Sequence, residues 1–279
     1  MACITPYQKM DKKHGINISV PCGKCPPCLK RRTSGWSFRL RQEGRRCTSA
    51  SFVTLTYDSA KLPEDSFTKN KFLTLNKRHV QLFFKKLRFA HGQSQIKYYA
   101  VGEYGTKSWR PHYHILLFNA DLRLVQPAWE YGAIHYGEIT DASIGYCLKY
   151  MTKEGKIPQH QNDDRQKEFS LMSKGLGSNY LTPSMAHYHK SDLTQRMHCV
   201  LPDGKKIAMP RYYKEKIYTE SERKIIGWQA IEDNIKREAD YWQLMEKLHG
   251  DRAVEVSAQT HIDSFNKMHK NGIENRNKI

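Results

Sequence analysis

Long hydrophobic runs are missing from this chain of 279 residues: it contains no stretch of about 18 apolar residues of the kind that crosses a membrane as a helix. The N-terminal segment 1–15 lacks the apolar core of a secretory signal peptide. The seven cysteines are odd in number and unevenly spaced, which does not fit a secreted disulfide scaffold. We therefore expect a soluble intracellular protein with one sizeable core, or a core with an appended helical region.

Acidic side chains are also scarce. The chain has 28 Asp and Glu against 46 Lys and Arg, which gives a formal net charge of +18. Eleven of the basic residues lie within residues 1–50, where Asp11 and Glu43 are the only acidic ones. A basic surface that only contacts solvent is one explanation. A polyanionic partner is the more specific one, because neutralising phosphates releases counterions, so the composition favours nucleic acid.

The hydrophobic pattern predicts a mixture of short strands and helices. Alternating apolar and β-branched residues indicate strands, and apolar residues three and four positions apart indicate helices. The connection before His112 contains glycine and proline, which favours an antiparallel hairpin. The order of elements predicts an α+β fold with a central antiparallel sheet and helices on one face. The expected strands are 52–58, 96–104, 112–118 and 132–140, with a hairpin at 198–213, and the expected helices are 34–46, 76–91, 141–153 and 219–249.

Three regions are expected along the chain. Residues 1–48 form a basic, cysteine-rich and largely loop-like N-terminal module, and residues 49–190 form the α+β core. Residues 191–279 hold a hairpin and a charged helical extension. The last twenty or so residues are polar, and we expect them to be disordered.

Two histidines interrupt an otherwise apolar strand in the segment "WRPHYHILLF" at 109–118. His112 and His114 lie two residues apart and therefore project from the same face of a strand. In a simple hairpin Glu103 pairs with His112 and Val101 with His114, which brings the carboxylate to the face of both imidazoles. A carboxylate and two imidazoles with open positions suit a catalytic divalent ion. The alternatives are an incidental histidine pair and a solvent-facing Glu103.

The segment "YCLKYMTK" at 146–153 places two tyrosines one turn apart on the predicted helix. Ile144, Cys147, Leu148 and Met151 form its apolar stripe. Tyr146, Lys149, Tyr150 and Lys153 form a second stripe roughly opposite. An amphipathic helix with a basic face is the simpler interpretation.

A metal ion beside these tyrosines would give them a chemical role. A phenol with a pKa near 10 is a poor nucleophile at neutral pH, but a cation on a phosphate activates the phosphorus and orients the leaving oxygen. A nearby lysine offsets charge on the phosphate or favours the phenolate. Attack by tyrosine leaves a covalent phosphotyrosine, which keeps the phosphodiester energy for later rejoining. A second tyrosine one turn away could attack the next junction.

A third pattern is the cysteine run "CGKCPPC" at 22–28. Pro and Gly between the cysteines favour a tight turn. Cys22, Cys25 and Cys28 supply three thiolates, one fewer than a tetrahedral structural zinc site needs. Reduced cysteines without metal are the alternative.

Taken together, these motifs resemble the HUH endonucleases, the initiators of rolling-circle replication. The resemblance rests on "FVTLTYD" at 52–58, the His-hydrophobic-His strand and the two-tyrosine helix, in that order along the chain. Within the family, the chain is similar to the initiators of gokushovirus-type microviruses, which are phages with single-stranded DNA. The resemblance covers roughly residues 1–215. The further segments that carry it are "PCGKCPPCLKRRTSGWSFRLRQE", "EFSLMSKGLGSNYLT" and "MPRYYKEKIY".

The resemblance implies a nicking and joining enzyme. His112 and His114 match the metal ligands, with Glu103 as a third ligand, and the implied ion is Mg²⁺ or Mn²⁺. Tyr146 and Tyr150 match the paired nucleophiles, and Lys149 the lysine between them. The implied reaction nicks the duplex replicative form at the origin, leaves a 5′-phosphotyrosine and a free 3′-OH, and later circularises the displaced strand. A host polymerase and helicase would be partners, in the bacterial cytoplasm.

The resemblance also implies a fourth zinc ligand, because the microvirus group carries a cysteine at the position of Cys3. Cys47 is the competing candidate. A bound zinc would fold a basic module that contains Lys30, Arg31 and Arg32. Two other functions stay open: a non-catalytic nucleic-acid-binding protein with a zinc knuckle, and a single-tyrosine transposase of the same superfamily.

Overall fold

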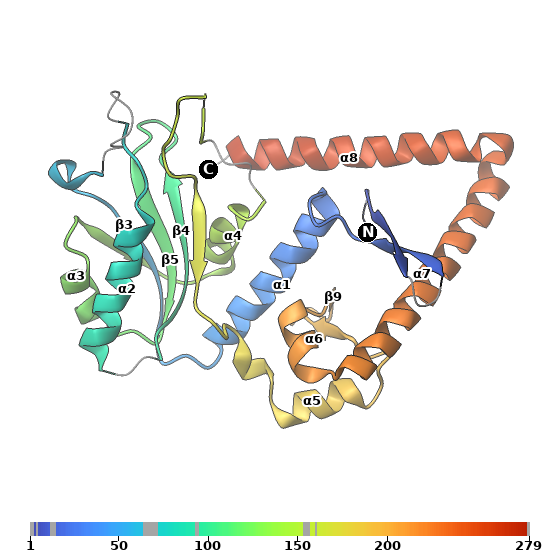
Figure 1. The fold of residues 1–279 in the computed structure, drawn as a ribbon, viewed down its shortest axis with the longest axis horizontal. Helices are drawn as coiled ribbons and strands as arrows, with labels where there is room; N and C mark the ends of the chain where they lie inside the picture. Colours follow the sequence, from blue (N-terminus) through green and yellow to red (C-terminus); the bar gives the residue numbers. More distant parts are fainter. Residues whose placement is uncertain are drawn as a thin grey trace. The chain divides into compact units, whose positions relative to one another are not determined.

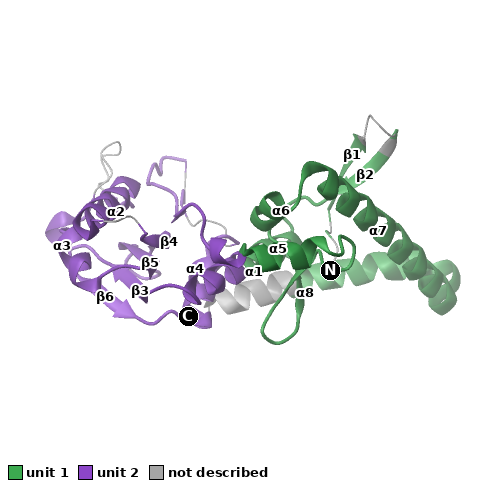
Figure 2. Ribbon diagram, turned by 90° about the horizontal axis from the view of Figure 1, so that it is seen from below, with its two compact units in different colours: residues 1–35, 181–279 green, residues 36–180 purple. Residues whose placement is uncertain are grey.

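The computed structural model describes residues 3, 5–11, 15–63, 72–92, 95–152, 157–159 and 161–277. The chain divides into two compact units, which Figure 2 shows in different colours. One unit contains residues 36–180, and the other contains residues 1–35 together with 181–279. The division at 48 and 190 that we expect from the sequence stays a prediction.

A five-stranded sheet forms the centre of the unit 36–180, with the strand order β6-β3-β5-β4-β7. Every pair of neighbours is antiparallel. This sheet confirms the α+β prediction, and β5 with its two histidines lies in the middle of it (Figure 1). The strands are β3 (Ala50–Leu55), β4 (Lys97–Tyr104), β5 (Pro111–Phe118), β6 (Ile134–Gly137) and β7 (Phe169–Met172).

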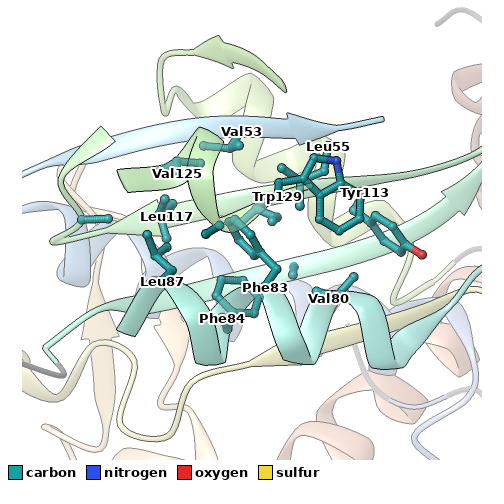
Figure 3. Close-up of a cluster of buried hydrophobic side chains, with 14 of the residues drawn as sticks. Val53, Leu55, Val80, Phe83, Phe84, Leu87, Tyr113, Leu117, Val125 and Trp129 are labelled. Carbon is teal, nitrogen blue, oxygen red and sulfur yellow. The ribbon is translucent and has the colours of Figure 1, made fainter. Parts of the chain in front are cut away.

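Helix α2 (Lys77–His91) covers one face of the sheet. The stripe predicted from the sequence is confirmed, because its four apolar residues are all buried against the sheet (Figure 3). The Asn76 side chain caps the start of the helix by accepting two main-chain N–H groups, and Gly92 ends it in the left-handed conformation. The core on this side contains Val80, Phe83, Phe84 and Leu87 of α2, with Val53, Leu55, Tyr113, Ile115, Leu117 and Trp129.

Helices also cover the other face of the sheet, so the expectation of helices on one face is wrong. Leu40 of α1 and Ile144, Cys147 and Leu148 of α4 pack there, against Tyr99, Val101, Leu116 and Phe118 of the sheet. The reason is visible in β5, where residues 115–118 are all buried. Successive strand residues point to opposite faces, so an unbroken apolar run needs cover on both.

The N-terminal region contains more regular structure than the sequence predicted. Strands β1 (Tyr7–Asp11) and β2 (Ile16–Val20) form an antiparallel hairpin. Helix α1 runs over Pro26–Gly44, well before the expected start at 34. The two prolines at 26–27 look like loop residues, but a first helical turn tolerates proline because its N–H groups have no helical partner.

Helix α4 (Asp141–Lys149) carries the tyrosine segment. Its N-cap is Thr140 rather than the expected Asp141, since Thr140 and Ser143 form a reciprocal capping box. The helix ends four residues before the predicted end, and Tyr150 is its C-cap, still with right-handed helical angles. Lys153 lies outside the described residues.

The C-terminal region contains the predicted hairpin and helix. Strands β8 (His198–Val200) and β9 (Lys206–Ala208) pair around Asp203-Gly204. The end of the expected hairpin instead belongs to helix α6 (Arg211–Ile217). Helix α7 (Glu220–His249) confirms the helical prediction. The short elements are α3 (Val125–Ala128), α5 (Pro183–Lys190) and four 3-10 turns at 59–61, 122–124, 178–180 and 250–252.

Helix α8 (Ala253–Asn277) replaces the disorder that we expected at the C-terminal end, so that expectation is wrong. Ala253 and Ser257 are buried one turn apart, and the Tyr241 hydroxyl on α7 donates a hydrogen bond to Ser257. Small residues at this spacing let two helices approach closely even where the composition is polar. Across the described ranges, the structure contains no helix that is long and apolar enough to span a membrane.

Candidate active site and metal centres

The hairpin of β4 and β5 has the register that the sequence predicted. Glu103 pairs with His112, and Val101 pairs with His114. The carboxylate oxygen Oε1 of Glu103 lies 2.7 Å from Nε2 of His112 and 2.9 Å from Nε2 of His114. Glu103 is only 4% exposed, so this cluster lies at the buried base of its face.

Charge in the cluster depends on these short contacts. Burial alone would raise the pKa of Glu103, but hydrogen bonds from His112, His114 and Tyr146 hold it well below its ordinary value. Burial would lower the pKa of His112, yet its hydrogen bond to Glu103, the charge of that carboxylate and the Arg110 carbonyl raise it. Glu103 is therefore an anion that faces an imidazole stabilised in its protonated form.

The same three side chains could hold a metal ion. One ligand atom from each of Glu103, His112 and His114 lies within 4.8 Å of the other two. The Nδ1 atoms are engaged elsewhere, with the Arg110 carbonyl at 3.1 Å from His112 and the Thr54 hydroxyl at 2.9 Å from His114. Both Nε2 atoms are thus directed to one point beside the carboxylate. Two nitrogens and one oxygen fit a divalent cation and leave positions for oxygens of a substrate.

The tyrosines of α4 reach the same cluster. The Tyr146 hydroxyl donates to Oε1 of Glu103 at 2.5 Å, and the Tyr150 hydroxyl donates to the Tyr146 oxygen at 3.4 Å. The Lys149 ammonium lies 3.8 Å from the centroid of the Tyr146 ring. Burial, then the hydrogen bond to Glu103 and its charge, raise the pKa of Tyr146 well above its ordinary value. The structure therefore brings together all six residues that the sequence singled out for this site.

Packing of α4 explains this proximity. The apolar side of the helix, with Ile144, Cys147 and Leu148, is buried against the sheet. Tyr146 lies beside that stripe, and its ring meets the His114 ring edge to face with centroids 4.9 Å apart. The Arg41 guanidinium forms an ion pair with Asp141 at 2.9 Å, in the first turn of α4. The buried stripe fixes the rotation of the helix, and the rotation aims the phenols at Glu103.

Two further residues of the site were not recognised from the sequence. Phe52 stacks on His114, with ring centroids 5.3 Å apart and planes 6° from parallel. The Thr54 hydroxyl contacts the same imidazole. Both residues lie on β3, and Thr54 pairs directly with His114. Their alternate spacing in "FVTLTYD" was the available signal, but only the pairing of β3 with β5 tells which face it serves.

The second candidate metal centre is formed by cysteines of the other unit. The sulfur atoms of Cys3, Cys22, Cys25 and Cys28 all lie within 4.8 Å of one another. Cys3 is thus the fourth member of the group, whereas the Cys47 thiol donates to the Gly44 carbonyl. All seven cysteines of the chain are free, without a disulfide.

Main-chain geometry around Cys22 is typical of a thiolate ligand. The N–H groups of Lys24 and Cys25 donate to its sulfur at 3.4 and 3.3 Å, in a turn that places Gly23 at a φ of +74°. The Thr5 hydroxyl and these N–H groups lower the pKa of Cys22 to about 5. Burial instead raises the pKa of Cys28 to about 12. A cation would reverse the second shift, because a coordinating thiol loses its proton.

Comparison with known proteins adds a family to this geometry. Residues 50–155, which contain the histidine strand and the tyrosine helix, match the family model of the replication-associated protein ORF2. The chain is 31% identical over 205 residues to the replication-associated protein ORF2 of Spiroplasma virus 4, which covers 66% of this chain and 63% of that protein. This chain is a relative of the phage replication-associated proteins.

Two other relatives agree with this assignment. Replication-associated protein VP4 of Bdellovibrio phage phiMH2K is 27% identical over 74% of this chain and 70% of its own length. Replication-associated protein ORF4 of Chlamydia phage 1 is 26% identical over 72% of this chain and 54% of its own length. The chain thus spans less than two thirds of the Spiroplasma virus and Chlamydia phage proteins. No solved structure matches the chain.

Proposed function

We propose that this chain is a replication initiator that nicks phage DNA at the origin through a tyrosine and rejoins the displaced strand. One observation carries the proposal. Oxygen Oε1 of Glu103 receives both Nε2 atoms of the histidines and the Tyr146 hydroxyl, at 2.5 to 2.9 Å. A carboxylate oxygen has only two lone pairs. Replacing the imidazole protons by a cation relieves this excess and leaves a phenol at the edge of a metal site.

The cofactor of the proposed reaction is Mg²⁺ or Mn²⁺, held by Glu103, His112 and His114. When bound, such a cation supplies Lewis-acid activation of the scissile phosphate and neutralises its charge. Two imidazole nitrogens in the ligand set favour Mn²⁺, since Mg²⁺ prefers oxygen ligands.

The tyrosine supplies the nucleophile. The Tyr146 oxygen loses its proton and bonds to phosphorus, while the bond from phosphorus to the 3′ oxygen breaks. The products are a 5′-phosphotyrosine and a DNA strand with a free 3′-OH, which takes up the proton. The Lys149 ammonium beside the Tyr146 ring offsets negative charge that develops on the phenol and the phosphate.

The second tyrosine supports joining rather than simple hydrolysis. The Tyr150 oxygen lies 3.4 Å from that of Tyr146, so both phenols can reach one phosphate position. Tyr150 would cleave the regenerated origin after one round of synthesis, and the released 3′-OH would attack the first phosphotyrosine to close the circle. A single-tyrosine transposase gives no role to this second phenol.

The proposed partners follow from this reaction. The substrate is viral single- and double-stranded origin DNA, which the net charge of +18 favours. A host polymerase would extend the 3′-OH and a host helicase would open the duplex, in the bacterial cytoplasm.

A denaturing gel tests the proposal. Labelled single-stranded oligonucleotides that tile the genome encoding this chain are incubated with the protein and Mn²⁺. We expect a protein–DNA adduct on one oligonucleotide, and its loss in the double variant Tyr146→Phe/Tyr150→Phe. Binding without adduct or cleavage would instead favour the non-catalytic nucleic-acid-binding protein.

We also propose that the four-cysteine group holds a structural Zn²⁺. Four sulfurs within 4.8 Å supply the complete ligand set of a closed tetrahedral site, and N–H groups already stabilise one of them as a thiolate. The ion would join the segment before β1 to the start of α1, where Lys30, Arg31 and Arg32 lie.

Metal analysis of protein purified without chelator tests this site. We expect about one equivalent of zinc in the wild type and in Cys47→Ser, and less than half in Cys3→Ser, since a structural zinc needs all four ligands. Less than half an equivalent in the wild type would contradict the zinc proposal and leave the nicking proposal intact.

A further inference from the structure

The strand "FVTLTYD" has no role in the chemistry proposed so far, yet it touches the site. Thr54 of β3 pairs with His114 of β5, so both side chains lie on one face of the sheet. The Thr54 hydroxyl lies 2.9 Å from Nδ1 of His114. Phe52, two residues earlier, stacks on the same imidazole.

The two histidines differ in what faces their Nδ1 atoms. His112 faces the Arg110 carbonyl, which can only accept, so this contact requires a proton on Nδ1. His114 faces a hydroxyl, which can donate or accept. The main chain therefore fixes the tautomer of His112, whereas a single side chain decides that of His114.

We propose that Thr54 is a positioning residue for the catalytic cation. Its hydroxyl accepts the Nδ1 proton of His114 and leaves the lone pair of Nε2 for the metal. Phe52 holds the plane of the ring. This inference rests on the cation site of the proposed function, and it assigns the first motif of the chain to that site. Partners of this kind typically change metal affinity by about 10- to 100-fold.

Loss of the hydroxyl has a definite consequence. Without an acceptor at Nδ1, the neutral imidazole of His114 keeps its proton on Nε2, where Glu103 accepts it at 2.9 Å. The cation must then displace that proton and leave an unsatisfied N–H on the buried side of the ring. Thr54→Val removes the hydroxyl at nearly constant shape, and Thr54→Ser retains it.

Mn²⁺ titration of the full chain without DNA, with free Mn²⁺ followed by its paramagnetic resonance signal, measures the effect. We expect Thr54→Val to bind Mn²⁺ about 10-fold more weakly than the wild type, and Thr54→Ser to lie within about 2-fold of it. Thr56→Val is the matched control, because its hydroxyl donates to the Ala133 carbonyl and does not contact His114. The control should bind Mn²⁺ as the wild type does.

Nitrogen-15 NMR of the histidine rings gives a readout that a loss of packing would not produce. With Mg²⁺ bound, the wild type should carry the His114 proton on Nδ1, and metal-free Thr54→Val should carry it on Nε2. Equal Mn²⁺ affinity of Thr54→Val and Thr54→Ser would overturn the inference while the cation site stands. A wild type that binds Mn²⁺ at this affinity but forms no adduct with DNA would overturn the nicking proposal alone. A wild type without Mn²⁺ binding would overturn both.

Discussion

Glu103 connects the two halves of the candidate site. Its carboxylate receives two imidazoles from β5 and a phenol from α4 on one oxygen, and burial excludes water as a competing partner. The two tyrosines differ in this respect. Tyr146 donates to Glu103 directly, whereas Tyr150 donates to the Tyr146 hydroxyl.

This difference predicts unequal effects of the single tyrosine variants. We expect Tyr146→Phe to reduce adduct formation in the first cleavage by at least about 100-fold, since it removes the proposed nucleophile. Tyr150→Phe should keep the first cleavage within about tenfold and lose the joined circular product. Time courses on a labelled origin oligonucleotide measure both steps. Equal loss of first cleavage in the two variants would contradict this order.

A second residue-scale prediction concerns acid stability. Asp163 and Arg165 form a buried ion pair at 2.8 Å, and hydrogen bonds from Arg165 hold the pKa of Asp163 well below its ordinary value despite burial. A depressed pKa means that the carboxylate contributes stability above its unfolded-state pKa of about 4 and loses it as the pH falls below that value.

Asp163→Asn should therefore lower the melting temperature at neutral pH, because it leaves the Arg165 charge buried without its counterion. The gap in melting temperature between the variant and the wild type should narrow as the pH falls from about 5 to 3. Thermal melts followed by circular dichroism measure it. A gap that is constant with pH would show that the ion pair does not contribute.

At the scale of elements, each motif gains its function from a neighbour. Strand β5 supplies the histidines, β4 the carboxylate and β3 the hydroxyl and aromatic ring beside them. Helix α4 has only nine residues, too few for a stable helix in isolation. Its capping box at Thr140 and its packing on the sheet therefore decide where the tyrosines lie.

The cap gives an element-scale prediction. Thr140→Ala should lower the free energy of unfolding by about 1 kcal/mol, the usual effect of losing an N-cap hydroxyl. Urea denaturation measures it. Thr152→Ala is the control, because its hydroxyl donates to the Lys149 carbonyl after the end of α4 and caps no N-terminus. Equal losses in both variants would contradict a specific role of the cap.

On the scale of the whole molecule, charge is the dominant feature. The net charge of +18 exceeds what solubility requires of a small domain, typically about 2–8. Residues 30–32 of helix α1 are all basic. Electrostatic binding of a DNA backbone depends on such charge and not on base sequence.

Salt dependence tests this scale. The dissociation constant for a labelled single-stranded oligonucleotide should rise at least about 10-fold between 50 and 200 mM salt, because bound phosphates release counterions. Fluorescence anisotropy of the full chain measures it. The charge-reversed variant Lys30→Glu/Arg31→Glu should flatten the slope, whereas Lys224→Glu, on α7, serves as a control. A slope near zero in the wild type would argue against a nucleic-acid partner.

Sequence alone determined the features that come from chain periodicity. A strand points alternate residues to one face, so the pairing of His112 with His114 was certain once the strand was, and a short hairpin fixed Glu103 opposite His112. The stripe of α2 and the hairpin around Asp203-Gly204 are local patterns of the same kind.

Tertiary structure decided every relation between segments distant in the chain. The placement of Tyr146 at Glu103, the contact of Thr54 with His114 and the proximity of Cys3 to Cys25 span 43, 60 and 22 residues. The cover on both sheet faces and the helical end of the chain belong here too. Such contacts depend on how apolar faces pack in three dimensions, which no local spacing encodes.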